Sequence, residues 1–397
     1  MNIAFITFEF VTEKVKGGGL ASYLGNISSI LADAGHSVTI ITLSHINDSF
    51  EWKNHIRVER VCVPPLLIGK GRVWLSLINQ SRYLNRRLRK LIRAGRHFDI
   101  VQYPNANAVG LFRTRVPSVV RISNDSLLWR NSNIEGFDVD KEYKCETIQD
   151  KLEDIALKRA DRVFGPSSRI AGIISARTGR KIDIVESPYI QFDDDPDFVS
   201  DYLNLIKEKK YFLTFGQLSR MKGIQVIGES IYRLLDTHQE YYYIFSGPDR
   251  SIVSDGQYIT CMEYISENAK EYADRIIYLG CLPRRDLYPV IRAAKIVILP
   301  SRIDNMPNTC LEAMYLKKTV IGTDGAGFEQ LIANGENGFL ISRDSSDDLV
   351  KKADRIINMS DEELNIIGEK AFERTRQMNP KDTLDKTLAL YSEVLSK

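Results

Sequence analysis

The feature that most constrains the fold of this chain is a repeated alternation of short apolar runs and longer amphipathic stretches. The first two runs, residues 3–7 and 37–43, flank a stretch with apolar side chains at helical spacing. Those side chains are Leu20, Leu24, Ile27 and Leu31. A strand, a helix and a second strand in this order predict two parallel strands joined by a right-handed crossover. Runs that are apolar throughout favour strands covered on both faces.

The alternation occurs twice, which predicts two domains. It continues through residue 167, and it starts again at residue 211. Between the two series, residues 187–202 are acidic and contain two prolines, which is typical of a linker. A chain of 397 residues is also long for one hydrophobic core.

We therefore predict an α/β protein with two facing Rossmann-like domains, each a doubly wound parallel sheet. The predicted boundaries are an N-terminal domain at 1–190, a linker at 191–207, a C-terminal domain at 208–378 and a final helix at 379–397. The final helix is expected to pack back toward the N-terminal domain. Because such sheets bind ligands beyond the carboxyl ends of their strands, the cleft between the domains is the expected site.

Composition excludes several kinds of site and of protein. The five cysteines are scattered without a CxxC pair, and the five histidines show no metal-ligand spacing. We therefore expect buried thiols in a reducing cytosol, no metal and no cofactor. No apolar run reaches about 18 residues, so no membrane span is expected. The first ten residues carry no basic leader, so no signal peptide is expected and the predicted location is cytoplasmic.

Charge is unevenly distributed along the chain. Residues 1–195 hold 28 Lys and Arg against 22 Asp and Glu, a net charge of +6, whereas the remainder is −4. Within the first half, residues 81–97 carry seven Lys and Arg beside a helical face of leucines. This pattern indicates either a helix whose leucines pack on its own sheet or a loose electrostatic contact with anionic membrane lipid. Nucleic acid is disfavoured, because aromatic residues are not interleaved with the basic ones.

Three loops carry candidate chemistry, and the first is residues 14–20, with Gly17, Gly18 and Gly19 between a predicted strand and a helix. Glycine allows close approach of the backbone, and a helix N-terminus favours an anion. The pattern is not GxGxxG, so a NAD site is disfavoured. A flexible turn and a phosphate or sugar contact remain equal alternatives.

The second loop, residues 215–223, also joins a predicted strand to a helix. Its Arg220 and Lys222 could neutralise a diphosphate, assisted by the helix dipole, or could be two solvated charges.

The third loop, residues 301–314, places Asp304 at a strand end and Glu312 inside the helix that follows. The N–H groups of that helix suit phosphate oxygens, while the two carboxylates suit hydroxyl groups of a sugar and a ribose. The alternative is a turn residue and a surface helix residue.

These loops together resemble the motifs of the retaining glycosyltransferases of the GT4-type family (group 1), which have the GT-B fold. "DNMPNTCLEAM" is similar to the family's acid–seven residues–Glu signature, and "FGQLSRMKG" is similar to its G-R-x-x-x-x-K-G loop. "TVIGTDGAGFEQLIANGENGFLI" resembles its continuation through Glu329, and "YLGCLPRRDL" its loop near the nucleobase. "KVKGGGL" is similar to the K-x-G-G-L of glycogen and starch synthases. The motifs occur in the family's order along nearly the whole chain.

The resemblance implies a role for each matching residue. Glu312 would hold the donor ribose and Asp304 the donor sugar. Lys222, with Arg220, would stabilise the departing diphosphate. Other donor contacts would come from Lys16, Gly18, Gly19, Gly216, Leu282, Met306, Pro307, Asn308 and Thr309. Transfer would proceed with retention and without metal, and domain closure would exclude water.

Three positions depart from the family pattern. Asp304 stands in place of Glu, and Gln217 in place of Arg. Where many members have a His, this chain has Ser123, followed by Asn124 and Asp125, which we assign to acceptor binding.

We predict a hexosyltransferase that uses a nucleotide sugar, with UDP-sugar preferred and GDP-mannose next. The expected acceptor is a saccharide or lipid-linked saccharide in cell-surface polysaccharide biosynthesis. The protein itself is expected in the cytoplasm, as a peripheral protein at the inner face of the membrane. One alternative is a catalytically silent scaffold that binds a sugar nucleotide or glycan. Another is a sugar-nucleotide epimerase of similar fold, although the chain has few histidines to serve one.

Overall fold

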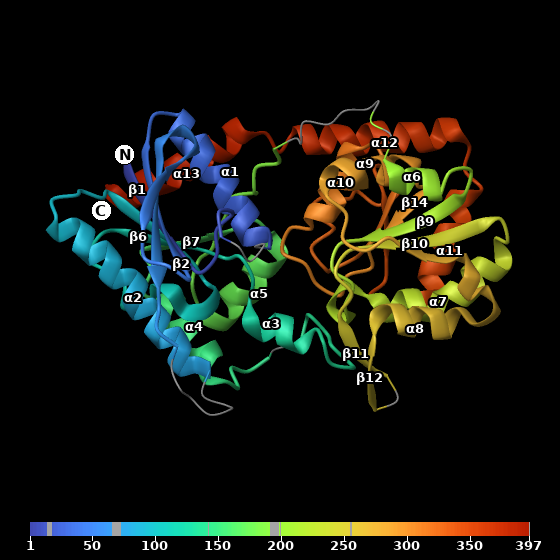
Figure 1. Cartoon of the computed structure of the whole chain (residues 1–397), viewed down its shortest axis with the longest axis horizontal. Helices are drawn as coiled ribbons and strands as arrows, with labels where there is room; N and C mark the ends of the chain where they lie inside the picture. The colour runs from blue at the N-terminus through green and yellow to red at the C-terminus, as the bar shows by residue number, and fades with distance from the viewer. Residues whose placement is uncertain are drawn as a thin grey trace. The chain divides into compact units, whose positions relative to one another are not determined.

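The structure is a computed structural model that describes residues 1–13, 18–65, 73–141, 143–190, 198, 200–254 and 256–396. Contacts within the chain divide it into two compact units. The first unit comprises Met1–Arg130, Asp140–Ile190 and Met378–Lys397, and the second comprises Asn131–Val139 and Gln191–Gln377. Each unit contains its own sheet covered by helices (Figure 1).

The first unit is built on an eight-stranded sheet of order β3-β4-β2-β1-β5-β6-β7-β8. All neighbours pair in parallel except β3 and β4, which are antiparallel. The strands are β1 (Asn2–Thr7), β2 (Ser37–Ser44), β3 (Ser49–Trp52), β4 (Ile56–Cys62), β5 (Ile100–Pro104), β6 (Ser118–Arg121), β7 (Arg162–Gly165) and β8 (Asp183–Ile184). The predicted strand–helix–strand start is present, with Ile3 of β1 opposite Val38 of β2.

Helices cover both faces of this sheet. They are α1 (Gly19–Asp33), α2 (Val73–Arg93), α3 (Ser126–Asn131), α4 (Ile148–Lys158), α5 (Ser168–Thr178) and α13 (Pro380–Leu395). Short 3-10 helices lie at η1 (Lys53–His55) and η2 (Ala106–Phe112). The final helix α13 packs in the core beside α1, where Tyr391 is fully buried and its hydroxyl donates to Gln102 over 2.6 Å.

The second unit is built on a six-stranded parallel sheet of order β13-β10-β9-β14-β15-β16. Its strands are β9 (Lys210–Phe215), β10 (Tyr241–Ser246), β13 (Ile276–Tyr278), β14 (Ile296–Ile298), β15 (Val320–Thr323) and β16 (Phe339–Ile341). A separate antiparallel hairpin joins β11 (Ser251–Ser254) to β12 (Gln257–Thr260). Because β9, β14 and β15 are buried at nearly every position, they need cover on both faces.

That cover comes from two layers of helices, which lie above and below the sheet in Figure 1. They are α6 (Asp201–Leu205), α7 (Ile224–Thr237), α8 (Cys261–Ala269), α9 (Arg284–Ala293), α10 (Asn308–Tyr315), α11 (Ser346–Ile357) and α12 (Asp361–Arg376), with 3-10 helices η3 (Arg220–Lys222) and η4 (Lys270–Arg275). The prediction of doubly wound α/β sheets is confirmed. In the second unit the loops after β9 and β14 lie at the carboxyl edge of the sheet, where ligands are expected.

Candidate functional site

Two loops of the second unit meet because glycine removes the side chain at their points of contact. A Cβ atom on Gly223 would lie 1.9 Å from the carbonyl oxygen of Pro300, and the φ of Gly223 is +78°. A Cβ atom on Gly216 would lie 2.9 Å from the Thr309 side chain. Only glycine therefore lets the loop after β9 approach the loop that leads into α10 this closely.

The contact brings Lys222 and Asp304 together as an ion pair, in which the Lys222 ammonium donates to Asp304 Oδ2. Asp304 is 8% exposed. Its backbone is fixed as well, because its N–H donates to the Ala326 carbonyl over 2.7 Å. Gly327 permits that contact, since a Cβ there would lie 2.3 Å from the Asp304 carbonyl oxygen. The carboxylate thus has a defined position with a cation beside it.

Glu312, on α10, is the second buried carboxylate of the site and is also 8% exposed. Nε of Arg284, at the start of α9, donates to Glu312 Oε1 over 3.0 Å. Burial raises the pKa of Glu312, while the charge and hydrogen bond of Arg284 oppose that rise. The carboxylate therefore depends on Arg284, or on a ligand that replaces it, to stay ionised.

The N-terminus of α10 is suited to an anion. Pro307 is its N-cap and supplies no side-chain hydrogen bond, and the first turn holds no acidic residue. The first N–H groups of a helix have no partner within the helix. Pro307 and Met306 are buried, whereas Asn308 is exposed. This end of α10 can therefore accept phosphate oxygens.

The other predicted donor residues, and the residues beside them, differ in exposure and in partners. Leu282, in the loop that precedes α9, is half-buried. The buried hydroxyl of Ser219, beside η3, has no hydrogen-bond partner among the described residues. Within that described part, Arg220 forms no ion pair with Asp304 or Glu312, and Gln217 is exposed. The structure thus gathers Lys222, Asp304 and Glu312 at one edge.

Sequence reasoning missed two arginines that organise this edge. Arg284 falls within the quoted motif "YLGCLPRRDL", so the motif itself carried a signal. Arg302 is 3% exposed, pairs with Asp344 over 2.8 Å and donates to the carbonyl oxygens of Ser132 and Ile134. It ties the loop before α10 to the segment 131–139, and no local pattern indicated this contact.

The structure describes part of the glycine loop of the first unit. Lys16 lies outside the described residues. Gly18 and Gly19 are exposed at the start of α1, and a Cβ on Gly18 would meet nothing within 4 Å. The carboxylate of Glu9 accepts the N–H of Ala21 over 3.1 Å and faces that of Gly18 at 3.5 Å. A carboxylate of the chain itself therefore accepts N–H groups at this helix end, and the donor contact of Gly18 and Gly19 stays a prediction.

The candidate acceptor residues follow β6 in the first unit. Asp125 is buried; it caps α3 through the Leu128 N–H and pairs with Arg177 over 2.6 Å. Ser123 and Asn124 are half-buried beside it. The Ser123 hydroxyl accepts from Arg121 over 3.0 Å. Asp125 is thus engaged in structural contacts, while Ser123 and Asn124 remain accessible.

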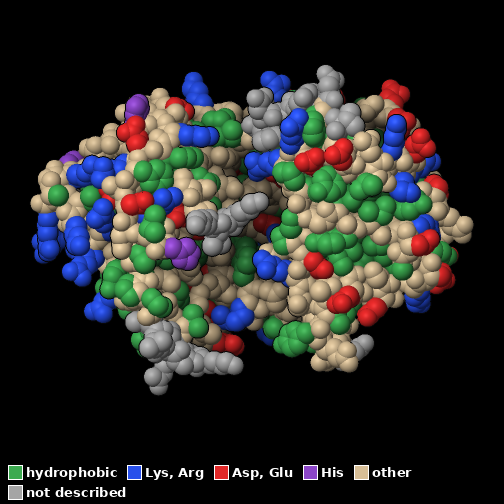
Figure 2. All heavy atoms as spheres, viewed as in Figure 1, with side chains coloured by type: hydrophobic (Ala, Val, Ile, Leu, Met, Phe, Trp, Pro, Cys, Tyr) green, Lys and Arg blue, Asp and Glu red, His purple; other side chains and the backbone are tan. Residues whose placement is uncertain are grey.

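The basic segment 81–97 lies mainly on α2. Leu84, Leu88 and Leu91 are buried against the unit's own sheet. Its exposed cations are Arg82, Arg86, Lys90, Arg93 and Arg96. Lys and Arg side chains gather where α2 lies in Figure 2. The leucine face is therefore covered by protein, which leaves a charged outer face.

The described residues also bear on metal binding and on a membrane span. No group of three or more His, Cys, Asp or Glu side chains there is placed to hold a metal ion. None of the helices in the described ranges is both long and apolar enough to cross a membrane.

Two known protein families together match most of the chain. Residues 198–374 match the family described as glycosyl transferases group 1, and residues 18–189 match the glycosyl transferase 4-like domain. An uncharacterized glycosyltransferase of Methanocaldococcus jannaschii is 21% identical over 375 residues, covering 90% of this chain and 89% of that protein. The chain spans only 28% to 42% of the length of the other curated relatives it matches.

Solved structures show the same fold over the full chain. Sucrose-phosphate synthase from Thermosynechococcus elongatus aligns with a TM-score of 0.76 at 17% identity and covers 100% of both chains. Anabaena HepE, solved in complex with UDP and glucose, aligns with a TM-score of 0.68 at 17% identity over 99% of each chain.

Proposed function

We propose that this chain, which belongs to the group 1 family of glycosyltransferases and has the GT-B fold, transfers a hexose from a nucleoside diphosphate sugar to a saccharide or glycolipid acceptor. The observation that carries the proposal is the grouping of Lys222, Asp304 and Glu312 around the open N-terminus of α10. One cation, one phosphate-binding helix end and two carboxylates match the parts of a sugar nucleotide.

In this proposal the diphosphate lies between Lys222 and the first N–H groups of α10. Glu312 accepts hydrogen bonds from the ribose diol in place of its bond from Arg284. Asp304 accepts a hydroxyl of the donor sugar and, through its ion pair, holds Lys222 near the phosphates. Arg284 is then released from Glu312, while Lys222 keeps its pair with Asp304, and neither change requires a large movement of the loops.

The reaction breaks the bond between the anomeric carbon and the distal phosphate oxygen and forms a bond to an acceptor oxygen. Negative charge grows on the departing diphosphate, where Lys222 and the N–H groups of α10 stabilise it. The acceptor proton passes to that phosphate. Because the acceptor gives its proton to the departing phosphate, it attacks from the same face of the sugar, and the anomeric configuration is retained. The step needs no metal, because the lysine and the helix end supply the positive charge.

UDP-sugar is the preferred donor and GDP-mannose the next. The likeness to Anabaena HepE, whose structure holds UDP and glucose, supports the first choice. Ser123 and Asn124 are the candidate acceptor contacts in the first unit. The exposed cations of α2 would attract anionic lipid at the inner face of a membrane, where a lipid-linked saccharide would be found.

A silent scaffold is the second candidate, and the ion pair between Lys222 and Asp304 is the observation that favours it. In that candidate the pair of the half-buried Lys222 and the buried Asp304 is a structural replacement for a reactive site. The scaffold would bind the nucleotide sugar without consuming it, whereas the transferase would release free nucleoside diphosphate.

The deciding experiment is thermal unfolding with UDP, GDP, ADP and their common sugar conjugates. A ligand at 100 times its dissociation constant stabilises a protein by about 2.7 kcal/mol. We expect one nucleotide series to raise the melting temperature of the wild type and not that of Glu312→Ala. Glu362→Ala, which removes an exposed glutamate from α12, is the matched control and should keep the shift.

Two further measurements distinguish the transferase from the silent scaffold. Glu312→Gln keeps the size of the side chain, so loss of the shift there excludes a simple packing defect. Release of nucleoside diphosphate from the stabilising sugar conjugate, with a glycan acceptor present, supports the transferase. A shift without any release supports the scaffold, and no shift with any nucleotide contradicts the proposed donor site.

A further inference from the structure

We propose that the second unit has a separate binding site for a phosphate-bearing ligand, at the opposite edge of its sheet from the donor site. A cavity of about 780 Å³ lies there. It opens where Lys210 begins β9 and Tyr241 begins β10, and where Lys295 and Thr319 immediately precede β14 and β15. Because the strands are parallel, these four residues mark the amino edge.

The lining of this cavity, which we name the lysine pocket, is strongly positive. Five lysines contribute to it, namely Lys209, Lys210, Lys295, Lys317 and Lys318. Glu240 and Asp361 are its only acidic members among the described residues. A concave surface with an excess of one charge raises the local concentration of the opposite charge. The pocket therefore attracts anions.

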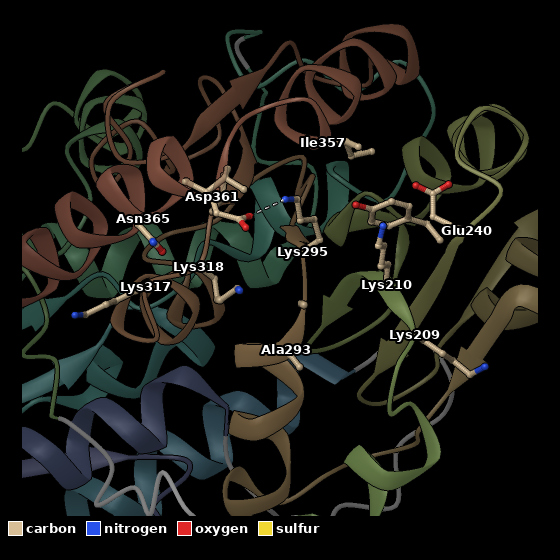
Figure 3. A pocket seen from close by; sticks show the side chains of 14 residues that line it. Lys209, Lys210, Glu240, Ala293, Lys295, Lys317, Lys318, Ile357, Asp361 and Asn365 are labelled. Atoms are coloured by element: carbon tan, nitrogen blue, oxygen red, sulfur yellow. Dashed lines mark ion pairs between the residues drawn. The ribbon is translucent and has the colours of Figure 1, made fainter.

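Two of the five lysines are engaged elsewhere. Lys209 lies over the ring of Tyr242, with its ammonium 3.9 Å from the ring centroid, and Lys317 pairs with Glu369. Figure 3 shows both extending away from the centre of the pocket. The ammonium groups of the other three lie between them in the same view.

Those three, Lys210, Lys295 and Lys318, have few partners. The Lys318 ammonium donates to the Arg292 carbonyl over 2.9 Å, and Lys295 lies 3.7 Å from an oxygen of the exposed Asp361. Lys210 is exposed, and its ammonium is 6.0 Å from the ring centroid of Tyr241. An ammonium carries three N–H donors, so each of these has capacity for a ligand.

The charge on Lys318 is costly without a ligand. Burial and the neighbouring charge of Lys295 lower the pKa of Lys318 to about 8. Two ammonium groups that repel each other in a partly desolvated pocket are both stabilised by an anion bound between them. A phosphoryl group offers several acceptor oxygens and would satisfy donors from more than one lysine.

Local structure explains the lysines only in part. Lys317 and Lys318 follow the C-terminus of α10, and the Lys318 ammonium meets a carbonyl at the C-terminal end of α9, where cations are favourable. Lys295 directly follows Ala294, the C-cap of α9, so that helix end favours its charge as well. Lys210 begins β9 and gains nothing from a helix dipole. A purely structural role therefore leaves Lys210 unexplained, whereas a ligand accounts for all three.

The volume and the chemistry of the lining limit the class of ligand. About 780 Å³ is the size of pockets that hold nucleotide-sized molecules. Tyr241, Ile357 and Leu364 add an apolar wall on which the uncharged part of a ligand could rest. Both a soluble phosphate compound and the headgroup of an anionic lipid present the required phosphoryl group.

The test is calorimetric titration with inorganic tripolyphosphate, which carries the phosphoryl chemistry alone. We expect Lys295→Gln/Lys318→Gln to bind at least about tenfold more weakly than the wild type. Lys210→Glu changes an exposed position and should weaken binding similarly. It provides the test if the double variant does not fold. Lys351→Gln/Lys370→Gln removes the same charge from exposed positions on α11 and α12 and should bind as the wild type does.

Tripolyphosphate could also bind the donor site, so Lys222→Ala is titrated in parallel and should retain the binding event that the pocket variants lose. Co-sedimentation with phosphatidylglycerol vesicles then separates the two sources. Vesicle binding that tripolyphosphate displaces, and that Lys295→Gln/Lys318→Gln loses although it keeps the cations of α2, identifies a lipid headgroup. Tripolyphosphate binding without such vesicle binding identifies a soluble phosphate compound. Equal affinity in the wild type and the pocket variants, or equal loss in the control, overturns the proposal.

Discussion

The two edges of the sheet in the second unit hold their charges in opposite ways. At the carboxyl edge each key cation has a carboxylate partner: Lys222 has Asp304, Arg284 has Glu312 and Arg302 has Asp344. At the amino edge the lysine pocket sets five lysines against two acidic residues. The same sheet thus offers one charge-matched edge and one strongly positive edge.

The difference shows two ways to prepare for an anion. Paired charges hold loops and rotamers in place before the ligand arrives, and the ligand then exchanges one partner for another. Unpaired charges keep a long-range field but cost stability while the pocket is empty. The first arrangement suits a site of chemistry, where geometry matters most, and the second suits a site of binding alone.

The largest expected effect comes from removing the cation of the carboxyl edge. Lys222→Ala takes away the charge that we propose lies next to the departing diphosphate, so we expect a fall in kcat of about 100- to 1000-fold. Steady-state kinetics with the donor found by thermal unfolding measures it. Lys351→Ala on α11 is the control. A fall in apparent donor affinity alone, with kcat intact, would show that Lys222 binds without aiding the reaction.

The next effect concerns the contact that holds the two loops of that edge together. Gly223→Ala places a Cβ 1.9 Å from the Pro300 carbonyl oxygen at a φ of +78°, so the loops must separate. We expect a loss of about 2–4 kcal/mol in the free energy of unfolding. Gly335→Ala is matched in backbone conformation, with a φ of +84° and nothing within 4 Å, and should cost only about 1 kcal/mol. Equal losses in urea unfolding would contradict this account.

A smaller effect should follow when one pair is broken from the cation side. Arg284 opposes the rise that burial causes in the pKa of Glu312. In Arg284→Gln that pKa should rise further, so the carboxylate becomes protonated at a higher pH than in the wild type. Protonation would weaken the ribose contact that we propose for it. On acidification we expect the nucleotide affinity of Arg284→Gln to fall about tenfold more than that of the wild type. Calorimetric titrations across the pH range test this, with exposed Arg376→Gln as the control.

The smallest effect concerns the free energy that the charge of Lys318 in the lysine pocket costs the folded protein. The pKa of Lys318 is lowered to about 8, so below that pH the folded protein carries a charge that the unfolded chain carries more favourably. The penalty disappears as pH rises from about 8 toward the ordinary lysine value.

Relative to Lys318→Met, the wild type should therefore gain about 1 kcal/mol of stability over that range, allowing for partial exposure. Lys317→Met removes an exposed neighbour and should show no such trend. Urea unfolding at several pH values between 7 and 10 measures both. A constant difference between wild type and Lys318→Met would show that the Lys318 charge carries no penalty.

Local patterns made the strands and the carboxyl-edge loops predictable. Apolar runs placed β9 and β14, and the position of Asp304 and Glu312 relative to the second run placed one at a strand end and the other inside a helix. The pairing of Arg284 with Glu312 is a contact across 28 positions of sequence, and no local pattern specifies its partner. The approach of Glu9 to α1 is missed for the same reason, because it depends on how the chain turns after β1.

The lysine pocket corresponds to a pattern that is visible in the sequence. A lysine directly precedes or opens three separate apolar runs, in "KYFLTF", "KIVILP" and "KKTVIG". Parallel strands bring their amino ends to one edge, so a residue repeated at that position of several strands must cluster in space. The pattern was visible, but its meaning depended on knowing that β9, β14 and β15 are neighbours.

The bond network of Arg302 bears on how the protein can be divided for study. Its guanidinium donates to the carbonyl oxygens of Ser132 and Ile134, in a segment that is separated from the rest of the second unit by residues 140–190 of the first. A recombinant fragment that begins at residue 191 would leave this buried cation with Asp344 but without those two acceptors. Such a fragment should be poorly folded, and a synthetic peptide of residues 131–139, added to it, should restore its melting temperature.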